Sequence, residues 1–444
     1  MKIVISGAGD VGSHLARLLS HEDQDILVID PDAEKLERLD AKYNLMTLTG
    51  NPTSFSTLRE AQADQADLFI AVMPSESSNM LACAMAKSLG ARRTVGRIEN
   101  YDYMQPMNRA FATRMGVDQL IYPEDLAAEQ IVTALERTWV RHWFEIHDGQ
   151  IIVVGVRLHG NPPLVGMQLK EFASTNHSFH VSAIKRHNDT IIPRGDDRML
   201  ENDILYITTT RDHVADLIAL TGKTPTRVRR VLVMGAGKIA RRLIDMAGDR
   251  FKFTVIDRDI DACRRLSERC PEASVYHGDA RDIDLWSDVG IDDIDAFIAL
   301  TASSETNILA CLTAKEEGVP KTIAEVEDIQ FINQAEGLNI GSIINKKLLA
   351  SSKIFQMLID SDDNNARCLA LTDAEVAEFE VRPGAKITKA PIKDVSIPRD
   401  ITLAGLIRDG HGMLVTGGTH VLPGDRVVVF CLAGTLHKVE KLFK

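Results

Sequence analysis

The 444-residue chain lacks any hydrophobic run long enough to cross a membrane. A spanning helix needs about 20 consecutive apolar residues, and every apolar stretch of this sequence is much shorter. The N-terminus also lacks the charged region and cleavage site of a signal peptide, because an apolar strand pattern begins at Lys2. We therefore expect a soluble protein of the cytoplasm.

Positive charge is also in short supply. Asp and Glu together number 63 against 51 Lys and Arg, which gives a formal net charge of -12. Proteins that bind nucleic acid through its phosphates need a basic surface. The sequence also lacks a recognisable basic recognition helix, so we predict no nucleic-acid partner, and a nucleotide-sensing transcription factor is a disfavoured alternative.

Metal-type and catalytic patterns are missing as well. The six cysteines form no CxxC pair and have no histidine nearby at ligand spacing, so we expect buried apolar residues rather than a metal or redox site. A dehydrogenase needs a positioned acid, base or nucleophile beside the nicotinamide. The histidines of the middle of the chain form no such constellation. They are His147, His159, His177, His180 and His187.

What the sequence has instead is one glycine motif in two copies. The motif runs over residues 7–12 as GAGDVG and recurs 228 residues later, over residues 235–240, as GAGKIA. A fixed period over this distance indicates a duplicated structural unit. The register also holds beyond the glycines, at the pairs Asp30 and Asp257, Gly50 and Gly278, Ala71 and Ala299, and Asn79 and Asn307.

Short apolar strand patterns alternate with helical patterns around each motif. Fully apolar strands separated by helices are typical of a parallel, doubly wound sheet that is buried on both faces. We therefore predict the α/β class with two Rossmann-like sheets, each with its ligand crevice at the carboxyl ends of the strands. The predicted strands are 2–6, 26–29, 45–49, 68–72, 94–98 and 119–122, and then 231–234, 253–256, 273–277, 296–300, 322–326 and 342–344.

Each sheet pattern is followed by a helix and then by short strands with proline and glycine turns. We predict the helices at 124–139 and 345–359, and either core packing or a partner subunit is expected to cover their apolar faces. The short strands indicate a small α+β domain of about 80 residues in each half. They are predicted at 150–158, 180–185, 203–208, 402–407 and 426–431, with turns at 161–163, 382–384 and 423–425.

These patterns predict four domains in the order sheet, small, sheet, small. The polar segment 221–230 is expected to join the two halves. The predicted domains are 1–122 and 228–346 for nucleotide binding, and 140–223 and 362–444 for the small α+β domains.

The first motif has the residues that a dinucleotide site requires. Gly7 permits the tight turn, Gly9 lets the backbone approach a pyrophosphate, and Gly12 allows close packing of helix and strand. The amides at the start of the following helix favour phosphate. Asp30, 23 residues after Gly7, is placed to accept both ribose hydroxyls and to repel a 2'-phosphate, which favours NAD over NADP.

Further candidates for the first site follow the later strands. Arg97 ends the fifth strand and can bind a phosphate through its guanidinium group, and the alternative for Arg97 is a salt bridge to Asp30 or Glu76. The predicted residues of the first site are Gly7, Ala8, Gly9, Asp10, Val11, Asp30, Asn51, Pro52, Met73, Pro74 and Arg97.

The second copy departs from the first where charge matters. Glu325 occupies the place of Arg97, so phosphate binding is disfavoured there, although Lys238 adds positive potential beside the turn. We therefore expect the two sites to differ in ligand or affinity. The predicted residues of the second site are Gly235, Ala236, Gly237, Lys238, Ile239, Asp257, Asp279 and Thr301.

These motifs resemble the RCK or KTN family, the regulatory subunits of potassium transporters and channels. The resemblance covers nearly the whole chain and includes tandem members with two copies of the module. It rests on the two glycine motifs with their acidic residues and on residues 67–72, 75–76, 79–80, 96–98, 278–280, 297–301 and 305–307, with 163–166 and 423–425 in the small domains.

The resemblance implies a non-enzymatic regulatory protein. It implies that copies of the chain assemble into a ring on the cytoplasmic face of a potassium-translocating membrane subunit. It also implies that NAD or NADH, with ATP or ADP as further candidates, binds at the two crevices and shifts the ring between arrangements. An NAD-dependent oxidoreductase is the alternative function.

Overall fold

The computed structural model describes residues 1–20, 24–160, 163–187, 189–359, 367–371, 374–432 and 435–443. The chain divides into two compact units by its internal contacts. The first unit contains residues 1–126, 346–369 and 433–437, and the second contains residues 127–345, 370–432 and 438–444. None of the helices in the described ranges is long and apolar enough to span a bilayer.

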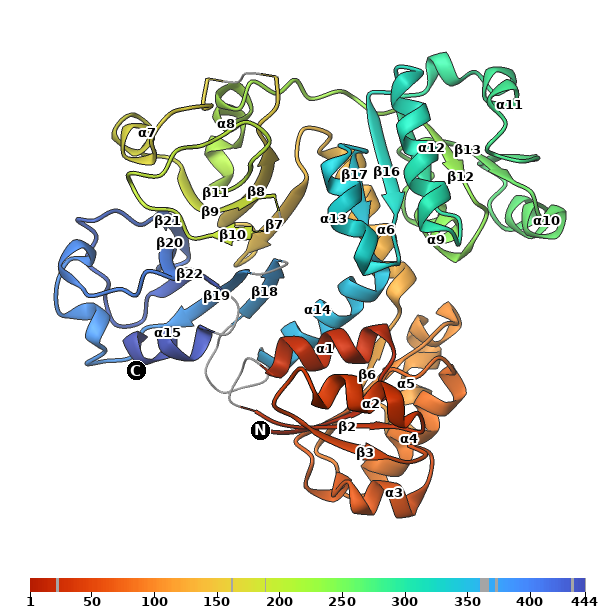
Figure 1. The fold of residues 1–444 in the computed structure, drawn as a ribbon, viewed down its shortest axis with the longest axis horizontal. Coiled ribbons are helices and arrows are strands. Elements are labelled where there is room, and N and C mark those ends of the chain that lie inside the picture. The colour runs from red at the N-terminus through yellow and green to blue at the C-terminus, as the bar shows by residue number, and fades with distance from the viewer. Residues whose placement is uncertain are drawn as a thin grey trace. The chain divides into compact units, whose positions relative to one another are not determined.

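A six-stranded parallel sheet forms the centre of the first unit (Figure 1). Its strand order is β3-β2-β1-β4-β5-β6, so the direction of strand addition reverses beside β1 and leaves a crevice at the carboxyl ends of the strands. The strands are β1 Lys2–Ser6, β2 Asp25–Asp30, β3 Met46–Thr49, β4 Leu68–Ala71, β5 Arg93–Arg97 and β6 Gln119–Ile121. The helices between them are α1 Asp10–Ser20, α2 Ala33–Asp40, α3 Phe55–Glu60, α4 Glu76–Leu89 and α5 Pro106–Arg114.

The strand sequences explain why this sheet is buried on both faces. Ile3, Val4 and Ile5 are consecutive in β1 and all have no exposed surface, although their side chains alternate between the two faces. One face carries a core to which helices α3, α4 and α5 contribute Leu58, Cys83 and Ala112, among others. The predicted parallel, doubly wound sheet is therefore confirmed for the first copy.

The second copy repeats this sheet with the same strand order, β14-β13-β12-β15-β16-β17, and all of its pairs are parallel. Its strands are β12 Arg230–Met234, β13 Lys252–Asp257, β14 Ser274–His277, β15 Ala296–Ala299, β16 Lys321–Glu325 and β17 Ser342–Ile344. Its helices are α9 Lys238–Ala247, α10 Ile260–Arg269, α11 Ile283–Asp288, α12 Ser304–Glu316 and α13 Ile329–Gly337. The predicted duplication is confirmed strand by strand.

Two five-stranded sheets form the small α+β parts, as predicted. In the first sheet all pairs are antiparallel, and the order is β10-β9-β11-β8-β7. It comprises β7 His142–Ile146, β8 Ile151–Arg157, β9 His180–Arg186, β10 Asp189–Ile191 and β11 Ile204–Thr209, with α7 Leu169–Thr175 and α8 Val214–Leu220. The second has the order β18-β19-β22-β20-β21 and comprises β18 Arg367–Leu371, β19 Ala374–Glu380, β20 Ile401–Arg408, β21 His411–Leu414 and β22 Arg426–Leu432, with α15 Leu436–Phe443.

The strand predictions for the small domains were incomplete. Strands β7, β10, β18, β19 and β21 were not predicted. Residues 161 and 162 of the predicted turn 161–163, and residues 362–366 of the predicted last domain, lie outside the described residues. The four domain boundaries stay predictions. Short 3-10 helices complete the described structure at 63–65, 101–104, 211–213, 291–293, 386–388 and 392–394.

The helix after the second sheet, α14 Lys346–Ile359, packs against α1 inside the first unit. The Ser351 hydroxyl is fully buried and donates to the carbonyl oxygen of Val11 at 3.1 Å. The Nζ of Lys347 lies 2.7 Å from Oδ2 of Asp10, the first residue of α1. This face of the predicted helix 345–359 is thus covered by the same chain.

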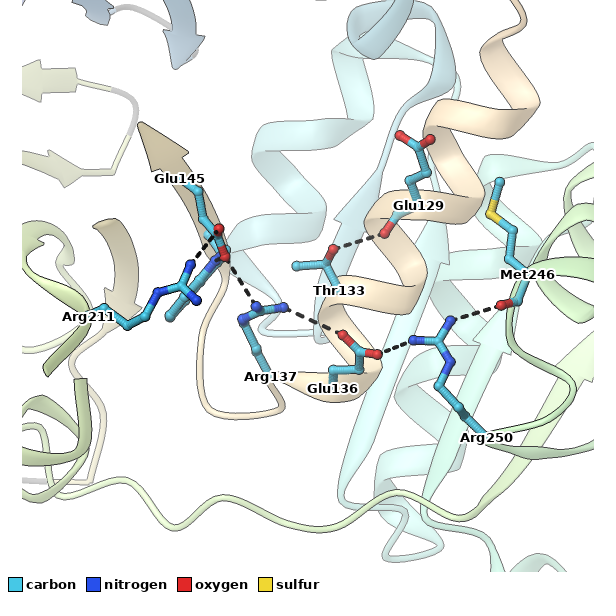
Figure 2. A network of polar contacts seen from close by, with 9 residues as sticks. Glu129, Thr133, Glu136, Arg137, Glu145, Arg211, Met246 and Arg250 are labelled. Atoms are coloured by element: carbon cyan, nitrogen blue, oxygen red, sulfur yellow. Dashed lines mark hydrogen bonds and ion pairs between the residues drawn. The ribbon is translucent and has the colours of Figure 1, made fainter. Parts of the chain in front are cut away.

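The helix after the first sheet, α6 Pro123–Glu136, ends three residues earlier than predicted. At its end, Arg137 lies between two carboxylates, with its guanidinium 3.6 Å from Glu136 and 3.3 Å from Glu145 on β7 (Figure 2). Arg211 also pairs with Glu145, at 3.3 Å, and Arg250 pairs with Glu136. These partly exposed pairs link α6, the first small sheet and the second parallel sheet of the second unit, and each contributes roughly 0–1 kcal/mol.

Candidate functional site

The first glycine turn has no room for side chains at two of its glycines. Gly7 has a φ of +107°, and a Cβ there would lie 3.0 Å from the backbone nitrogen of Met73. A Cβ on Gly12 would lie 1.8 Å from the carbonyl oxygen of Gly7. No atom lies within 4 Å of a Cβ built on Gly9, so the backbone there is open to a ligand. The turn has the geometry that close approach of a pyrophosphate requires.

Asp30 lies directly beside this turn at the end of β2. Its Oδ2 accepts a hydrogen bond from the backbone N–H of Ala8 at 2.7 Å, and its Oδ1 accepts one from the N–H of Asp32 at 2.9 Å. The residue is only 7% exposed. Because a carboxylate oxygen can accept two hydrogen bonds, each oxygen keeps acceptor capacity for a ribose hydroxyl. The structure therefore brings Asp30 and the glycine turn together in a fixed orientation.

Asn79 holds the neighbouring edge of the crevice. Its Oδ1 accepts from the N–H of Met73 at 2.8 Å, and its Nδ2 donates to the carbonyl oxygens of Met73 and Arg97, both at 2.9 Å. It thereby joins the ends of β4 and β5. The sequence analysis used Asn79 only as a marker of the repeat and missed this role, although its recurrence as Asn307 was the available signal.

Arg97 is placed at this edge, but its partner differs from the predicted alternatives. Its Nη2 lies 3.2 Å from Oε1 of Glu99, so the predicted pair with Asp30 or Glu76 is wrong. The carboxylate of Glu76 instead accepts from the N–H groups of Glu99 and Asn100, at 2.6 and 2.7 Å. The Nε of Arg97 is buried and has no hydrogen-bond partner among the described residues. That donor suits an oxyanion of a ligand.

The other predicted residues of the first site have local roles. The Oδ1 of Asn51 accepts from the N–H and the hydroxyl of Thr53, at 3.0 and 2.8 Å, and so closes its own turn. Pro52 is buried and Pro74 is exposed. Asp10 pairs with Lys347, a residue of α14 that the sequence analysis did not include. This pair brings a cation from a distant segment to the start of α1.

The second copy repeats the cradle around its acidic residue. The N–H groups of Ala236 and Asp259 donate to Oδ2 and Oδ1 of Asp257, at 2.7 and 2.8 Å. Gly235 has a φ of +110°, and a Cβ there would lie 2.8 Å from the carbonyl oxygen of Leu300. The match to the first copy extends to individual hydrogen bonds.

Asn307 repeats the second element of the site. Its Oδ1 accepts from the N–H and the hydroxyl of Thr301, at 3.0 and 2.6 Å. Its Nδ2 donates to the carbonyl oxygens of Thr301 and Glu325, at 2.9 and 2.8 Å. The hydroxyl of Thr301 is thereby oriented toward Asn307, whereas the corresponding Met73 has no polar side-chain atom to orient.

The charges of the second site differ from those of the first. Glu325 is 4% exposed and stands where the first copy has Arg97. The carboxylate of Asp279 accepts several hydrogen bonds from Arg281, one of them at 2.6 Å from Nη2, and these bonds lower the pKa of Asp279 to about 2. Lys238 is the exposed first residue of α9, directly after Gly237. The second crevice therefore holds two more carboxylates than the first at matching positions.

The described cysteines are all buried. Burial raises the pKa of Cys83, Cys270 and Cys311, so these thiols stay protonated at neutral pH. The side chain of Cys368 lies outside the described part of the structure. Within the described ranges, no three His, Cys, Asp or Glu residues are grouped in a way that would hold a metal ion.

Two protein families match this chain in tandem. The TrkA-N domain family matches residues 3–123 and 231–346, and the TrkA-C domain family matches residues 153–222 and 376–444. The Trk system potassium uptake protein TrkA of Halomonas elongata is 28% identical over 451 residues, with 100% of this chain and 99% of the relative covered. The TrkA homolog of Archaeoglobus fulgidus is 26% identical, with 100% of both chains covered.

Solved structures with the same fold include a potassium-channel type of assembly. The structure described as "GsuK channel bound to NAD" has a TM-score of 0.61 and 16% identity, and covers 100% of this chain and 78% of its own. The structure described as "Crystal Structure of the GsuK RCK domain" has a TM-score of 0.60 and 17% identity, with 100% and 94% covered. At this identity the likeness shows the fold.

Proposed function

Since the chain belongs to the TrkA family, we propose that it is the nucleotide-sensing regulatory subunit of a potassium-translocating membrane protein of the Trk type, and not an enzyme. The observation that carries the proposal is the paired cradle, in which Asp30 and Asp257 each accept an N–H of their own glycine turn. Two such cradles in one chain fit a sensor with two inputs. The relatives that match over the full length are named as potassium uptake proteins.

The proposed ligand of the first cradle is NAD or NADH, with ATP or ADP as further candidates. The amides at the start of α1 would face the phosphates, and Asp30 would accept the hydroxyls of the adenosine ribose. The unpartnered Nε of Arg97 would donate to a phosphate oxygen. A similar fold, that of GsuK, is described as bound to NAD, which supports this class of ligand.

The proposed output is a change in the arrangement of a ring of copies at the cytoplasmic face of the membrane. A ligand that binds one arrangement more tightly shifts the population by the difference in binding free energy, typically about 1–3 kcal/mol per site. In the first unit, the contact of α14 with the start of α1 provides a route. A phosphate at the glycine turn would compete with Asp10 for the ammonium of Lys347, 2.7 Å away.

Calorimetry with NADH, NAD, ATP and ADP tests this function. Asp30→Asn and Asp257→Asn keep the size of the side chain but remove its charge, and each should weaken binding at its own cradle while the melting temperature stays within a few degrees of that of the wild type. Binding of none of the four nucleotides by the wild type would refute the sensor. Consumption of NADH with turnover of a candidate substrate would instead support the oxidoreductase.

Binding to the partner is tested separately. The wild-type chain should be retained by a Trk-type potassium-translocating subunit in detergent or nanodiscs, and the nucleotides that bind should change the potassium flux of the complex. A complex whose flux is the same with and without each bound nucleotide would contradict the regulatory role, even if the nucleotides bind.

A further inference from the structure

A cavity of about 240 Å³ lies in the second unit between the first small sheet and the second parallel sheet. It is separate from both glycine turns, whose residues do not line it. Five basic residues line it, and they come from five different segments of the chain. They are Arg141 before β7, Arg157 at the end of β8, Lys223 in the segment that joins the two halves, Lys315 on α12 and Lys321 at the start of β16.

The hydrogen bonds of these cations go to neutral groups. In the part of the chain that the structure describes, none of the five forms an ion pair. The printed bonds are Arg141 Nη2 to Asn339 Oδ1 at 2.6 Å, Arg157 Nη1 to the carbonyl oxygen of Glu336 at 2.7 Å, Lys315 Nζ to the carbonyl oxygen of Asn339 at 2.6 Å, and Lys321 Nζ to Ser342 Oγ at 3.0 Å. The Nε of Arg157 is buried without a partner among the described residues.

Negative charge near the cavity does not balance this cluster. The carboxylate that acts on Arg141 and Arg157 is that of Glu336, and it already lies 2.7 Å from the Nζ of buried Lys185. His159 also lines the cavity, and its Nδ1 lies 4.0 Å from Glu201. Positive charge is therefore concentrated here in a protein whose overall net charge is -12.

The titration of the buried groups reflects this excess. Burial, and then the charge of Arg141, lower the pKa of Lys321 to about 7. Burial, and then Arg157, lower the pKa of Arg141 to about 10 despite the opposing effect of Glu336. His142 behind the cavity has a pKa of about 3, through burial first and then Lys185, Arg141 and Lys321, so it stays neutral. Burial, and then Arg141 and Arg157, also lower the pKa of Lys223 and Lys315.

We propose that this cavity binds a phosphate-class oxyanion, either free phosphate or diphosphate or the phosphate end of a nucleotide. The guanidinium groups of Arg141 and Arg157 offer fork-shaped donors that suit a phosphate. Hydroxyl groups of Thr138, Thr322 and Ser342 also line the cavity. Its volume is below the roughly 300 Å³ at which pockets for drug-sized ligands begin, so a small anion fits better than a whole nucleotide.

The anion would connect two parts of the second unit. Arg141 and Arg157 belong to the first small sheet, whereas Lys315 and Lys321 belong to the second parallel sheet. Without an anion these like charges repel each other across the cavity, and a multivalent anion would turn that repulsion into attraction. The site would thus give the chain a third input, which acts on the contact between these parts.

Calorimetry with pyrophosphate, in phosphate-free buffer, tests the proposal. Arg157→Gln should weaken binding by roughly tenfold to a hundredfold, because it removes a charge-assisted donor. Arg264→Gln removes the same charge from an exposed site on α10 in the same unit and should leave the affinity unchanged. Equal affinities of these two variants would overturn the proposal, as would the absence of binding to the wild type at millimolar pyrophosphate.

A proton measurement identifies the cavity independently. At pH 8 most Lys321 side chains should be neutral, so binding of the anion should take up close to one proton per site. The uptake is measured by repeating the titration in two buffers that differ in ionisation enthalpy. Lys321→Met should abolish the uptake, and an unchanged uptake in this variant would contradict the site. If Lys321→Met does not fold, Arg157→Gln with its matched control still decides the question.

Further arms separate this site from the nucleotide cradles and identify the source of the anion. A double variant with Asp30→Asn and Asp257→Asn should lose NADH binding but keep pyrophosphate binding, and loss of both would place the anion at the glycine turns and overturn the proposal. Titration of that double variant with ATP and with inorganic phosphate then shows which source binds. Pyrophosphate binding without any NADH binding by the wild type would leave this site standing while the proposed sensor fails.

Discussion

The two cradles of this chain have nearly the same backbone and different charges. Asp30 and Asp257 accept the same two amides at nearly the same distances, yet Arg97 in the first copy is replaced by buried Glu325 in the second. The backbone of a nucleotide site is thus preserved where its hydrogen bonds also hold the sheet together. Side chains that touch only the ligand are free to change.

Exchange of the residues at this position should break the difference between the cradles. Arg97→Glu should lower the affinity of the first cradle for nucleotide at least about 100-fold, because a charge-assisted donor is lost and a repulsive carboxylate is added. Glu325→Arg should raise the affinity of the second cradle for nucleotide. Calorimetry on the two single variants and on the double exchange measures both effects. Unchanged affinity after Arg97→Glu would contradict the phosphate role of Arg97.

Removal of the buried asparagines should affect both copies equally. Asn79→Ala and Asn307→Ala each leave buried backbone groups without partners, and each should destabilise its own sheet by roughly 3 kcal/mol. Hydrogen exchange of peptides from β4 and β5, compared with peptides from β15 and β16, reports the local effect. A large loss of protection in one copy only would show that the clamp has different importance in the two halves.

The third residues of α1 and α9 should respond in opposite ways. Gly12→Ala places a Cβ against the carbonyl oxygen of Gly7 and should cost about 2 kcal/mol of stability through overpacking, with weaker nucleotide binding at the first cradle. Ala240→Gly, the matched change in the second copy, should cost only about 1 kcal/mol through helix propensity. Urea unfolding and calorimetry give the two quantities. Tolerance of Gly12→Ala without loss of binding would mean that the first turn adapts as the second has done.

A pH titration should reveal the smallest difference. Hydrogen bonds from Arg281 lower the folded-state pKa of Asp279 from 3.8 to about 2, so the stability that this pair adds is present above pH 4 and is lost as the pH falls toward 2. The pair is partly exposed, so the effect should stay below about 1 kcal/mol. Asn51 does not titrate. Asp279→Asn should therefore remove a pH-dependent stability increment that Asn51→Ala leaves intact, measured by thermal unfolding between pH 2 and 5.

The parallel sheets were predictable because their strands are buried on both faces. Runs such as Ile3-Val4-Ile5 leave no alternative to a central strand, and the period of the repeat doubled every observation. The strands of the small domains were predicted less completely. β10 and β21 are short, partly exposed edge strands, whose three or four residues carry too weak a pattern.

Part of the candidate site was predictable for the same reason. Ala8 and Asp30 meet because both follow parallel strands, β1 and β2, whose carboxyl ends lie side by side. The partner of Arg97 was not predictable, because the choice among Glu76, Glu99 and Asp30 depends on side-chain packing in the loop after β5. The contact of Lys347 with Asp10 joins residues that are 337 positions apart and leaves no local pattern.

The sequence by itself determined the duplication, the two parallel sheets and the placement of an acidic residue beside each glycine turn, because these features follow from short-range patterns of apolar residues and glycine. Only the tertiary structure decided which cations share a cavity. Arg141, Arg157, Lys223, Lys315 and Lys321 are spread over 181 residues of an acidic chain. Burial among like charges lowers the pKa of Lys321, and no periodicity of the sequence records that burial.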